Sequence, residues 1–184
     1  MPRAPFSRKM QGSAWVFGDQ MDVDWHIISF ETLRGLGGPG MPPPSEEIQG
    51  KLCMVKVDPE FPNKVQQGDF IVAGRNFGYG HDHHNSCISI VSAGVPAVIC
   101  ESSNGNFVRN SIHHGLAVVE IPGITKMVKE GDKLELDLEA GVVKNLTKEE
   151  ELHFSPYPDF LLRLIEDKGL YEQLEKERQA GRVI

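Results

Sequence analysis

The chain has 184 residues, of which 40% are hydrophobic and 24% charged, and its formal net charge at pH 7 is −7. This length predicts one main domain with a proper core and short appended segments. The acidic balance argues against a nucleic-acid groove, because phosphate binding needs clustered Lys and Arg. The sequence contains neither an apolar run of roughly 20 residues nor an apolar signal core. We therefore expect a soluble, cytoplasmic protein that binds neither nucleic acid nor a membrane.

The cysteines are three, widely separated, and form no C-x-x-C pair. The sequence alone therefore supports neither a zinc site nor an iron–sulfur site in this chain. Cys53 and Cys100 lie in strand-like runs and are expected to be buried thiols, whereas Cys87 lies nearer the loop described below.

The N-terminal quarter is irregular in pattern. Residues 1–12 are expected to form a flexible tail, and residues 14–18 a short strand. Residues 22–29 mix charged and apolar side chains in a way that a plain surface loop does not. Residues 35–44 are rich in Gly and Pro and predict a functional or mobile loop. Ser45 opens a short helical turn.

The middle of the chain alternates strand and helix. The strands are expected at 70–73, 97–100 and 117–121, with helices at 85–93 and 104–114. This alternation indicates parallel strands joined by right-handed crossovers.

The last third predicts a hairpin and then helices. Residues 133–138 alternate polar and apolar side chains and pair with residues 141–145. Helices at 156–165 and 170–180 carry leucines that suggest docking on the domain or on a partner. We expect a main domain over 13–150 and a C-terminal helical extension over 151–184.

One loop concentrates groups that can do chemistry. Glycines at 74, 78 and 80 allow a tight turn and a close approach to a ligand. His81, Asp82, His83 and His84 follow at once, and imidazoles move protons near neutral pH. A strand leads in and a helix leads out, which is where α/β folds bind anions.

Several ordered segments together resemble one family. Residues 68–80, which read GDFIVAGRNFGYG, look like the corresponding run in the small subunit of 3-isopropylmalate dehydratase, in the aconitase superfamily. The ordered matches extend from residue 18 to about residue 145. The segments that match are residues 18–24, 32–34, 58–80, 93–102 and 107–116.

The resemblance implies an α/β fold, namely the swivelling β/β/α domain with a mixed sheet and flanking helices. It implies a separate large subunit that carries a [4Fe-4S] cluster, while this chain binds no metal and supplies the base and carboxylate-binding groups. The implied reaction is dehydration of a small 2-hydroxy carboxylic acid, usually followed by rehydration at the neighbouring carbon.

The active-site loop departs from the family pattern. His81 stands where the family has the serine that acts as base, and His83 where it has an arginine for a substrate carboxylate. Gly105 replaces a second arginine. A histidine cannot reproduce the bidentate fork of an arginine.

The departure has a chemical interpretation. An imidazole with an unperturbed pKa of roughly 6.5 accepts a proton at pH 7 directly, so we expect His81 to be the base. Asp82 or another loop carboxylate would orient its ring, and His83 would donate to a substrate oxygen. The helix start at His84 and Asn85 would seat an anion.

Two further residues are substrate-binding candidates through the resemblance. It places Asp24 near the substrate and beside a catalytic histidine, although an aspartate there also caps turns. It places Arg34 in the segment that tunes substrate choice, against the alternative of a plain surface arginine.

Three functions stay open from the sequence. The first is a catalytic hydro-lyase subunit, and the second is a non-catalytic binding or regulatory subunit with the same fold. The third is a free-standing lyase that uses the histidine loop, with or without a metal, although adjacent ligands strain a single-metal geometry.

Overall fold

The computed structural model describes residues 6–36 and 44–182. The Gly- and Pro-rich loop predicted over 35–44 therefore lies mostly outside the described residues. Within the described part, no helix is long and apolar enough to cross a membrane.

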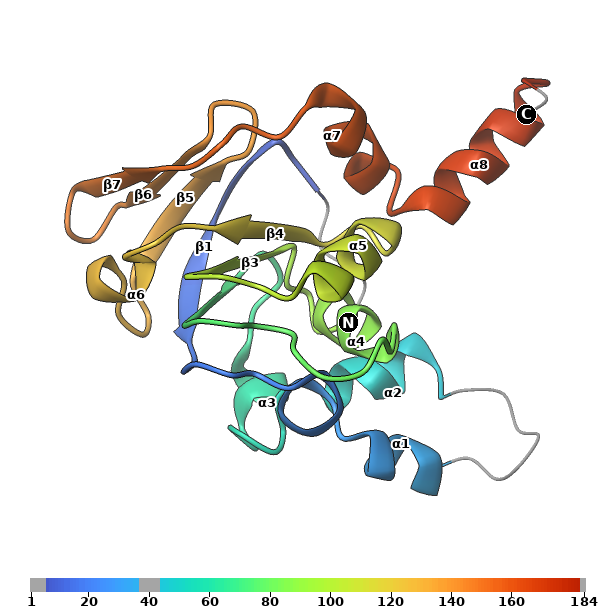
Figure 1. Cartoon of the computed structure of the whole chain (residues 1–184), viewed down its shortest axis with the longest axis horizontal. Coiled ribbons are helices and arrows are strands. Elements are labelled where there is room, and N and C mark those ends of the chain that lie inside the picture. The colour runs from blue at the N-terminus through green and yellow to red at the C-terminus, as the bar shows by residue number, and fades with distance from the viewer. Residues whose placement is uncertain (1–5, 37–43, 183–184) are drawn as a thin grey trace.

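The described residues form one seven-stranded sheet with helices on both faces (Figure 1). The strands are β1 (Lys9–Val16), β2 (Phe70–Ala73), β3 (Ala97–Cys100), β4 (Ala117–Glu120), β5 (Lys133–Asp137), β6 (Val142–Asn145) and β7 (Glu150–His153). The helices are the π-helical turn η1 (Val23–Ile27), α1 (Phe30–Gly35), α2 (Glu46–Lys51), α3 (Phe61–Lys64), α4 (Asn85–Ser92), α5 (Gly105–His113), α6 (Ile124–Met127), α7 (Asp159–Glu166) and α8 (Leu170–Gln179).

Strand β1 joins two halves of the sheet, whose order is β4-β3-β2-β1-β5-β6-β7. Residues 14–16 pair in parallel with β2, whereas residues 9–13 pair antiparallel with β5. Strands β2, β3 and β4 continue the parallel half through α4 and α5. Strands β5, β6 and β7 continue the antiparallel half. The expected mixed sheet, its crossovers and its hairpin are confirmed.

The N-terminal boundary differs from the expectation. Residues 9–12 belong to β1 rather than to a flexible tail, and Met10 is buried. A Cβ atom at Gly12 would collide with the carbonyl oxygen of Gly68, so only glycine lets the two backbones approach here. Residues 9–12 look like a tail in the sequence because they are mostly polar and include a glycine. In the fold, Gly12 lies against the backbone at Gly68.

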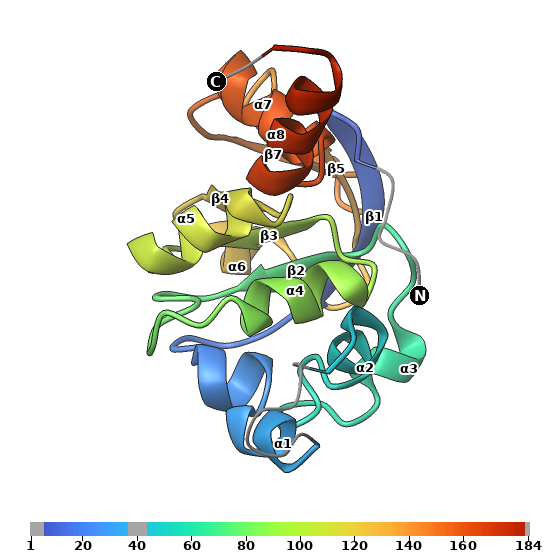
Figure 2. The ribbon, with the colours of Figure 1, turned by 90° about the vertical axis from the view of Figure 1, so that its right-hand side faces the viewer.

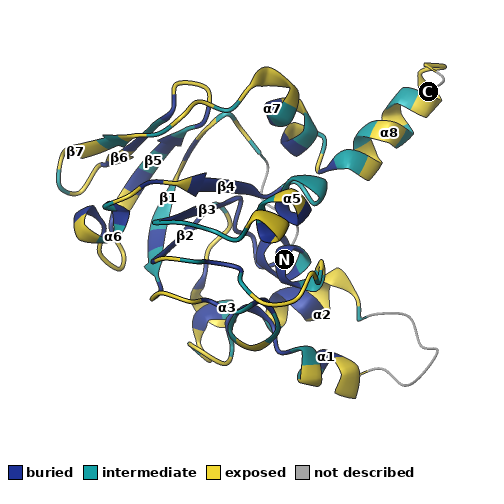
Figure 3. Ribbon diagram, in the orientation of Figure 1, coloured by how far each residue is buried: buried dark blue, intermediate teal, exposed yellow. Residues whose placement is uncertain are grey.

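Both faces of the parallel half are buried, as parallel sheets require (Figure 3). Along β2, Ile71 and Ala73 pack into one core with α4 and α5. Phe70 and Val72 pack into a second core with α6 and α7. Strands β2 and β3 are thus packed between two cores, which hold the ends of these strands in place.

The C-terminal region docks only in part (Figure 2). Strand β7 enters the sheet through His153, so the expected extension over 151–184 begins with sheet residues. Helix α7 buries Leu162 and Ile165 on the second core. Helix α8 buries none of its residues, and Tyr171 is 70% exposed. The leucines of α7 therefore face the domain, while α8 projects from it.

Tyr157 covers the free edge of β4. Its hydroxyl donates to the carbonyl of Val118 at 2.5 Å and accepts from the amide N–H of Val118 at 3.1 Å. One phenol thus satisfies a strand position that a neighbouring strand would otherwise pair. Burial raises the pKa of Tyr157 to about 12, so the hydroxyl keeps its proton.

We expect Tyr157→Phe to lower the free energy of unfolding by about 1–3 kcal/mol, because it leaves the Val118 backbone groups unpaired. Urea denaturation followed by circular dichroism measures this. The matched control is Tyr171→Phe at an exposed position on α8, which should change stability by less than about 0.5 kcal/mol. Equal stability of the two variants would contradict the edge-capping role.

Candidate active site

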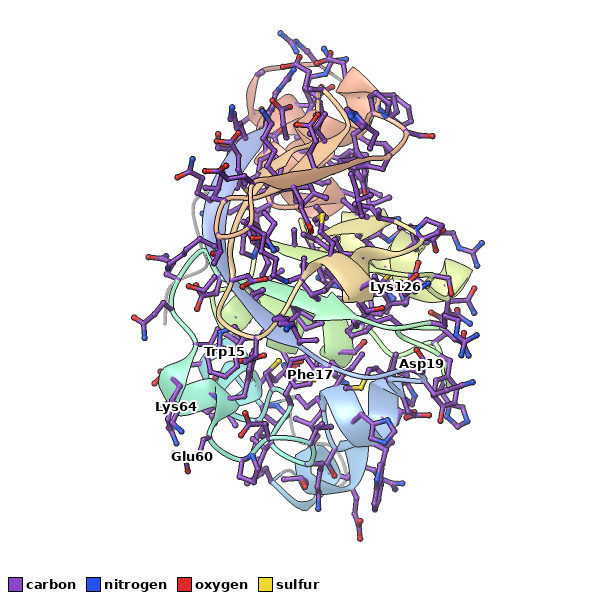
Figure 4. All side chains as sticks on the ribbon, turned by 90° about the vertical axis from the view of Figure 1, so that its left-hand side faces the viewer. Trp15, Phe17, Asp19, Glu60, Lys64 and Lys126 are labelled. Carbon is purple, nitrogen blue, oxygen red and sulfur yellow. The ribbon has the colours of Figure 1, made fainter. Side chains whose placement is uncertain are left out.

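The site lies at the carboxyl ends of β1, β2 and β3, where three chain segments run side by side. Figure 4 shows Trp15, Phe17 and Asp19 marking the path of the first segment as it leaves β1. The loop after β2, residues 74–80, forms backbone hydrogen bonds with the segment after β1 and with the segment after β3. The amide of Gly78 donates to the carbonyl of Met21 at 2.8 Å. The amide of Phe77 donates to the carbonyl of Ser102 at 3.0 Å. The loop is therefore held by backbone hydrogen bonds rather than swinging free.

Two glycines are required by the path of this loop. Gly78 has φ of 75°, and a Cβ there would collide with the ring of Phe107. Gly80 has φ of 112°, and a Cβ there would lie 2.9 Å from a carboxylate oxygen of Asp22. The left-handed backbone and the close packing both exclude a side chain.

An ion pair closes the start of the loop. The guanidinium of Arg75 contacts the carboxylate of Asp19 at 2.9 Å, and its amide donates to the same carboxylate at 2.7 Å. The backbone hydrogen bond and then the guanidinium lower the pKa of Asp19. Arg75 therefore connects the loop to the segment that follows β1.

Asp24 is placed by the π-helical turn η1. Asp22 caps this turn, because its carboxylate accepts from the amide of Asp24 at 2.8 Å. The amide of Asp22 in turn donates to Nδ1 of His26 at 2.9 Å. These local bonds fix the backbone from which the Asp24 carboxylate reaches the histidine loop. His26 thus supports the turn.

The Asp24 carboxylate binds two imidazoles at once. Its Oδ2 lies 3.0 Å from Nδ1 of His81, and its Oδ1 lies 2.6 Å from Nδ1 of His83. The Asp24 side chain is 18% exposed and that of His81 is 82% exposed. An ionised carboxylate only accepts hydrogen bonds, so both Nδ1 atoms carry protons. In the neutral rings the lone pair then sits on Nε2, away from Asp24.

The ring of His83 is also stacked on an aromatic side chain. Phe30, the first residue of α1, lies with its ring centroid 4.4 Å from that of His83, at an interplanar angle of 14°. The ring of His81 lies on His83 at 5.6 Å and 22°. The sequence did not single out Phe30, because no local pattern shows that α1 meets the histidine loop.

Asp82 and Arg34 have partners other than those expected. The carboxylate of Asp82 accepts from the side-chain amide of Asn110 on α5, so Asp24 rather than Asp82 contacts the His81 ring. The guanidinium of Arg34 lies 5.8 Å above the ring of Phe30. Arg34 is exposed on α1 and therefore shares the neighbourhood of the histidine pair.

His84 turns toward a different element. Its Nδ1 lies 2.7 Å from Nε2 of His114, at the end of α5, and its ring makes an edge contact with that ring. Asn85 is the first residue of α4 and is half-buried. The structure thus separates the loop into an Asp24 group with His81 and His83, and an α5 group with Asp82 and His84.

The cysteines lie in the core and not at this edge. Burial raises the pKa of Cys53 and Cys100 to about 12 and that of Cys87 to about 11. Protonated, buried thiols are poor metal ligands. Among the described residues, no three His, Cys, Asp or Glu side chains are arranged to hold a metal ion.

We expect Gly78→Ala to destabilise the chain by about 1–3 kcal/mol, because the added methyl must displace the buried Phe107 ring. Thermal unfolding monitored by calorimetry measures the loss. The control is Gly105→Ala at the start of α5, where a Cβ meets open space and should leave stability unchanged or slightly raised. A neutral Gly78→Ala variant would show that the loop is not held as described.

Comparison with known proteins gives the chain its family. No family model matches it. The 3-isopropylmalate dehydratase small subunit 1 of Methanopyrus kandleri is 40% identical over 168 residues, which cover 91% of this chain and 94% of that protein. The isopropylmalate/citramalate isomerase small subunit of Methanocaldococcus jannaschii is 38% identical, with 91% and 95% covered.

A solved structure agrees with these relatives. The crystal structure of 3-isopropylmalate dehydratase (leuD) from Methanocaldococcus jannaschii matches with a TM-score of 0.82 at 30% identity, over 94% of this chain and 97% of that chain. The expected swivelling α/β fold is thereby confirmed. The chain belongs to the family of 3-isopropylmalate dehydratase small subunits, which are components of a hydro-lyase.

Proposed function

We propose that this chain is the small subunit of a hydro-lyase that dehydrates and rehydrates a 2-hydroxy carboxylic acid, together with a cluster-bearing large subunit. The names of its relatives, among them an isopropylmalate/citramalate isomerase small subunit, support this substrate class. The observation that carries the proposal is the grip of Asp24 on two imidazoles at the strand-end edge.

A [4Fe-4S] cluster on the large subunit would assist departure of the substrate hydroxyl as a Lewis acid. The described part of this chain offers no ligand set for such a cluster, and its thiols are buried and protonated. We therefore assign the cluster to the partner. This chain would carry out the proton transfer and bind the substrate oxygens. That division requires an assembled complex, which we propose to be cytoplasmic.

His81 is the proposed base. Its Nδ1 is held by Asp24, so Nε2 presents its lone pair to solvent and to a docked substrate. Nε2 removes the proton from the carbon next to the substrate carboxylate, and the electron pair of that C–H bond forms the new double bond. The hydroxyl on the neighbouring carbon leaves with its own bonding pair. Asp24 stabilises the imidazolium that forms.

The neighbouring groups would bind substrate oxygens. His83, when protonated, donates from Nε2 to a carboxylate while Asp24 balances its charge. Arg34 on α1 adds a second cation, which lies over the Phe30 ring that stacks on His83. His84 and Asn85 stand at the start of α4, whose first-turn amides favour an anion. Asp82 is better explained as a tie between the loop and α5.

A non-catalytic binding or regulatory subunit remains the second candidate, because the resemblance sets His81 and His83, and Gly105 on α5, in place of the family's serine and two arginines. Reconstitution with a large subunit separates the two functions. The unsaturated product absorbs in the ultraviolet, so isopropylmalate-like, citramalate-like and citrate-like acids can be screened directly. Complex formation without turnover of any of these acids would favour the regulatory subunit.

We expect His81→Ala to abolish turnover in the reconstituted enzyme while the complex still forms, because the exposed ring contributes chemistry and little packing. Product absorbance measures turnover, and size-exclusion chromatography measures assembly. The matched control is His153→Ala on β7, an exposed histidine away from the site, which should leave the rate unchanged. Near wild-type rates in His81→Ala would remove His81 as the base.

A second variant tests the carboxylate. Asp24→Asn keeps the shape but offers an amide N–H to a ring nitrogen, which favours the tautomer whose Nε2 is protonated and cannot accept. We expect kcat to fall by about 10²–10⁴-fold, with assembly unaffected. If the Asp24→Asn enzyme keeps its kcat, the carboxylate does not set the state of the base.

A further inference from the structure

Phe30 occupies a fixed position at the start of α1. Ser29 caps the helix, since its hydroxyl accepts from the amide of Thr32 at 3.2 Å. Leu33 is buried one turn later and anchors the helix to the domain. The Phe30 ring is therefore carried by a capped and anchored helical turn rather than by a loose loop.

The rings of α1 and of the histidine loop form one column. Phe30 lies nearly parallel to His83, and His83 lies nearly parallel to His81. The guanidinium of Arg34 lies over the Phe30 ring, so a cation also borders the column. These contacts join residues from two segments that are far apart in the sequence.

The Asp24 carboxylate alone does not determine the orientation of the His81 and His83 ring planes. A single hydrogen bond to Nδ1 narrows the rotation of an imidazole about its Cβ–Cγ bond without fixing it, and each oxygen of Asp24 supplies one such bond. A flat neighbour that covers the ring face removes that rotation for His83. The ring of His81 lies nearly parallel to that of His83, with the two centroids 5.6 Å apart. The direction of both Nε2 atoms thus depends on the Phe30 surface as well as on Asp24.

We propose that Phe30 is a positioning residue for the histidine pair: its ring fixes the plane of His83, and through His83 and Asp24 the plane of His81. It does not touch the reacting atoms. The effect of Phe30 on turnover rests on the proposed function. Its effect on the tautomers of the two histidines can be observed in the isolated chain.

The expected effect differs between a flat and a branched side chain. Phe30→Leu keeps an apolar side chain on α1 but removes the flat face, so both rings should sample other orientations. Phe30→Tyr keeps the face and should behave as the wild type. Because Phe30 is only half-buried, both variants should fold.

The test uses nitrogen-15 NMR of the histidine rings in the full chain, with no partner present. In the wild type, His81 and His83 should show the tautomer with the proton on Nδ1. In Phe30→Leu, the signals of both should move toward the mixture seen in free imidazole, and Phe30→Tyr should restore the wild-type signals. The control is Phe160→Leu at an exposed position on α7, which should move neither histidine. Unchanged ring signals in Phe30→Leu would overturn the proposal.

A kinetic arm separates this proposal from the proposed function. In an active reconstituted enzyme, Phe30→Leu should lower kcat by about tenfold or more with a smaller change in KM, because misplacing a base costs rate steeply. If the wild-type complex is inactive but Phe30→Leu shifts the ring signals, the positioning role stands and the proposed function fails. If the wild-type complex is active and Phe30→Leu leaves the ring signals unchanged, the proposed function stands and the positioning role fails.

Discussion

The candidate site depends on one carboxylate that accepts hydrogen bonds from two imidazoles. Asp24 reaches both His81 and His83, and it can do so because the π-helical turn η1 carries it toward the histidine loop. The turn is itself closed by Asp22, which caps it. A fully buried carboxylate would be costly to ionise, and a fully solvated carboxylate would bind the two imidazoles only weakly. At 18% exposure, Asp24 lies between these limits.

The sheet makes this arrangement possible by fixing where three strands end. Both faces of the parallel half are buried, so the ends of β1, β2 and β3 do not move independently. The loop after β2 then pairs with the segments after β1 and β3 through backbone hydrogen bonds. Its glycines at 78 and 80 allow that pairing where side chains would collide. The loop residues are thereby positioned by the sheet, as binding and catalytic residues on loops commonly are positioned by a rigid scaffold.

The sequence predicted what depends on local pattern and missed what depends on long-range packing. Strands 70–73 and 97–100 and the helices beside them follow from periodicity and were confirmed. The family resemblance placed Asp24 beside a catalytic histidine; in the structure its carboxylate contacts His81 and His83, whose catalytic role is a proposal. The start of β1 at Lys9 was missed because its partner, β5, lies more than a hundred residues away. The stack of Phe30 on His83 was missed for the same reason, since no local pattern encodes the meeting of α1 and the loop.

The histidine pair handles charge differently from the serine and the arginine that the resemblance to the family places at these two positions. An arginine stays protonated throughout a reaction cycle, whereas the two imidazoles share one carboxylate. In the proposed mechanism, a proton taken by His81 adds positive charge beside the carboxylate that also binds His83. The proposed base and the proposed carboxylate-binding group are thus joined through a single aspartate.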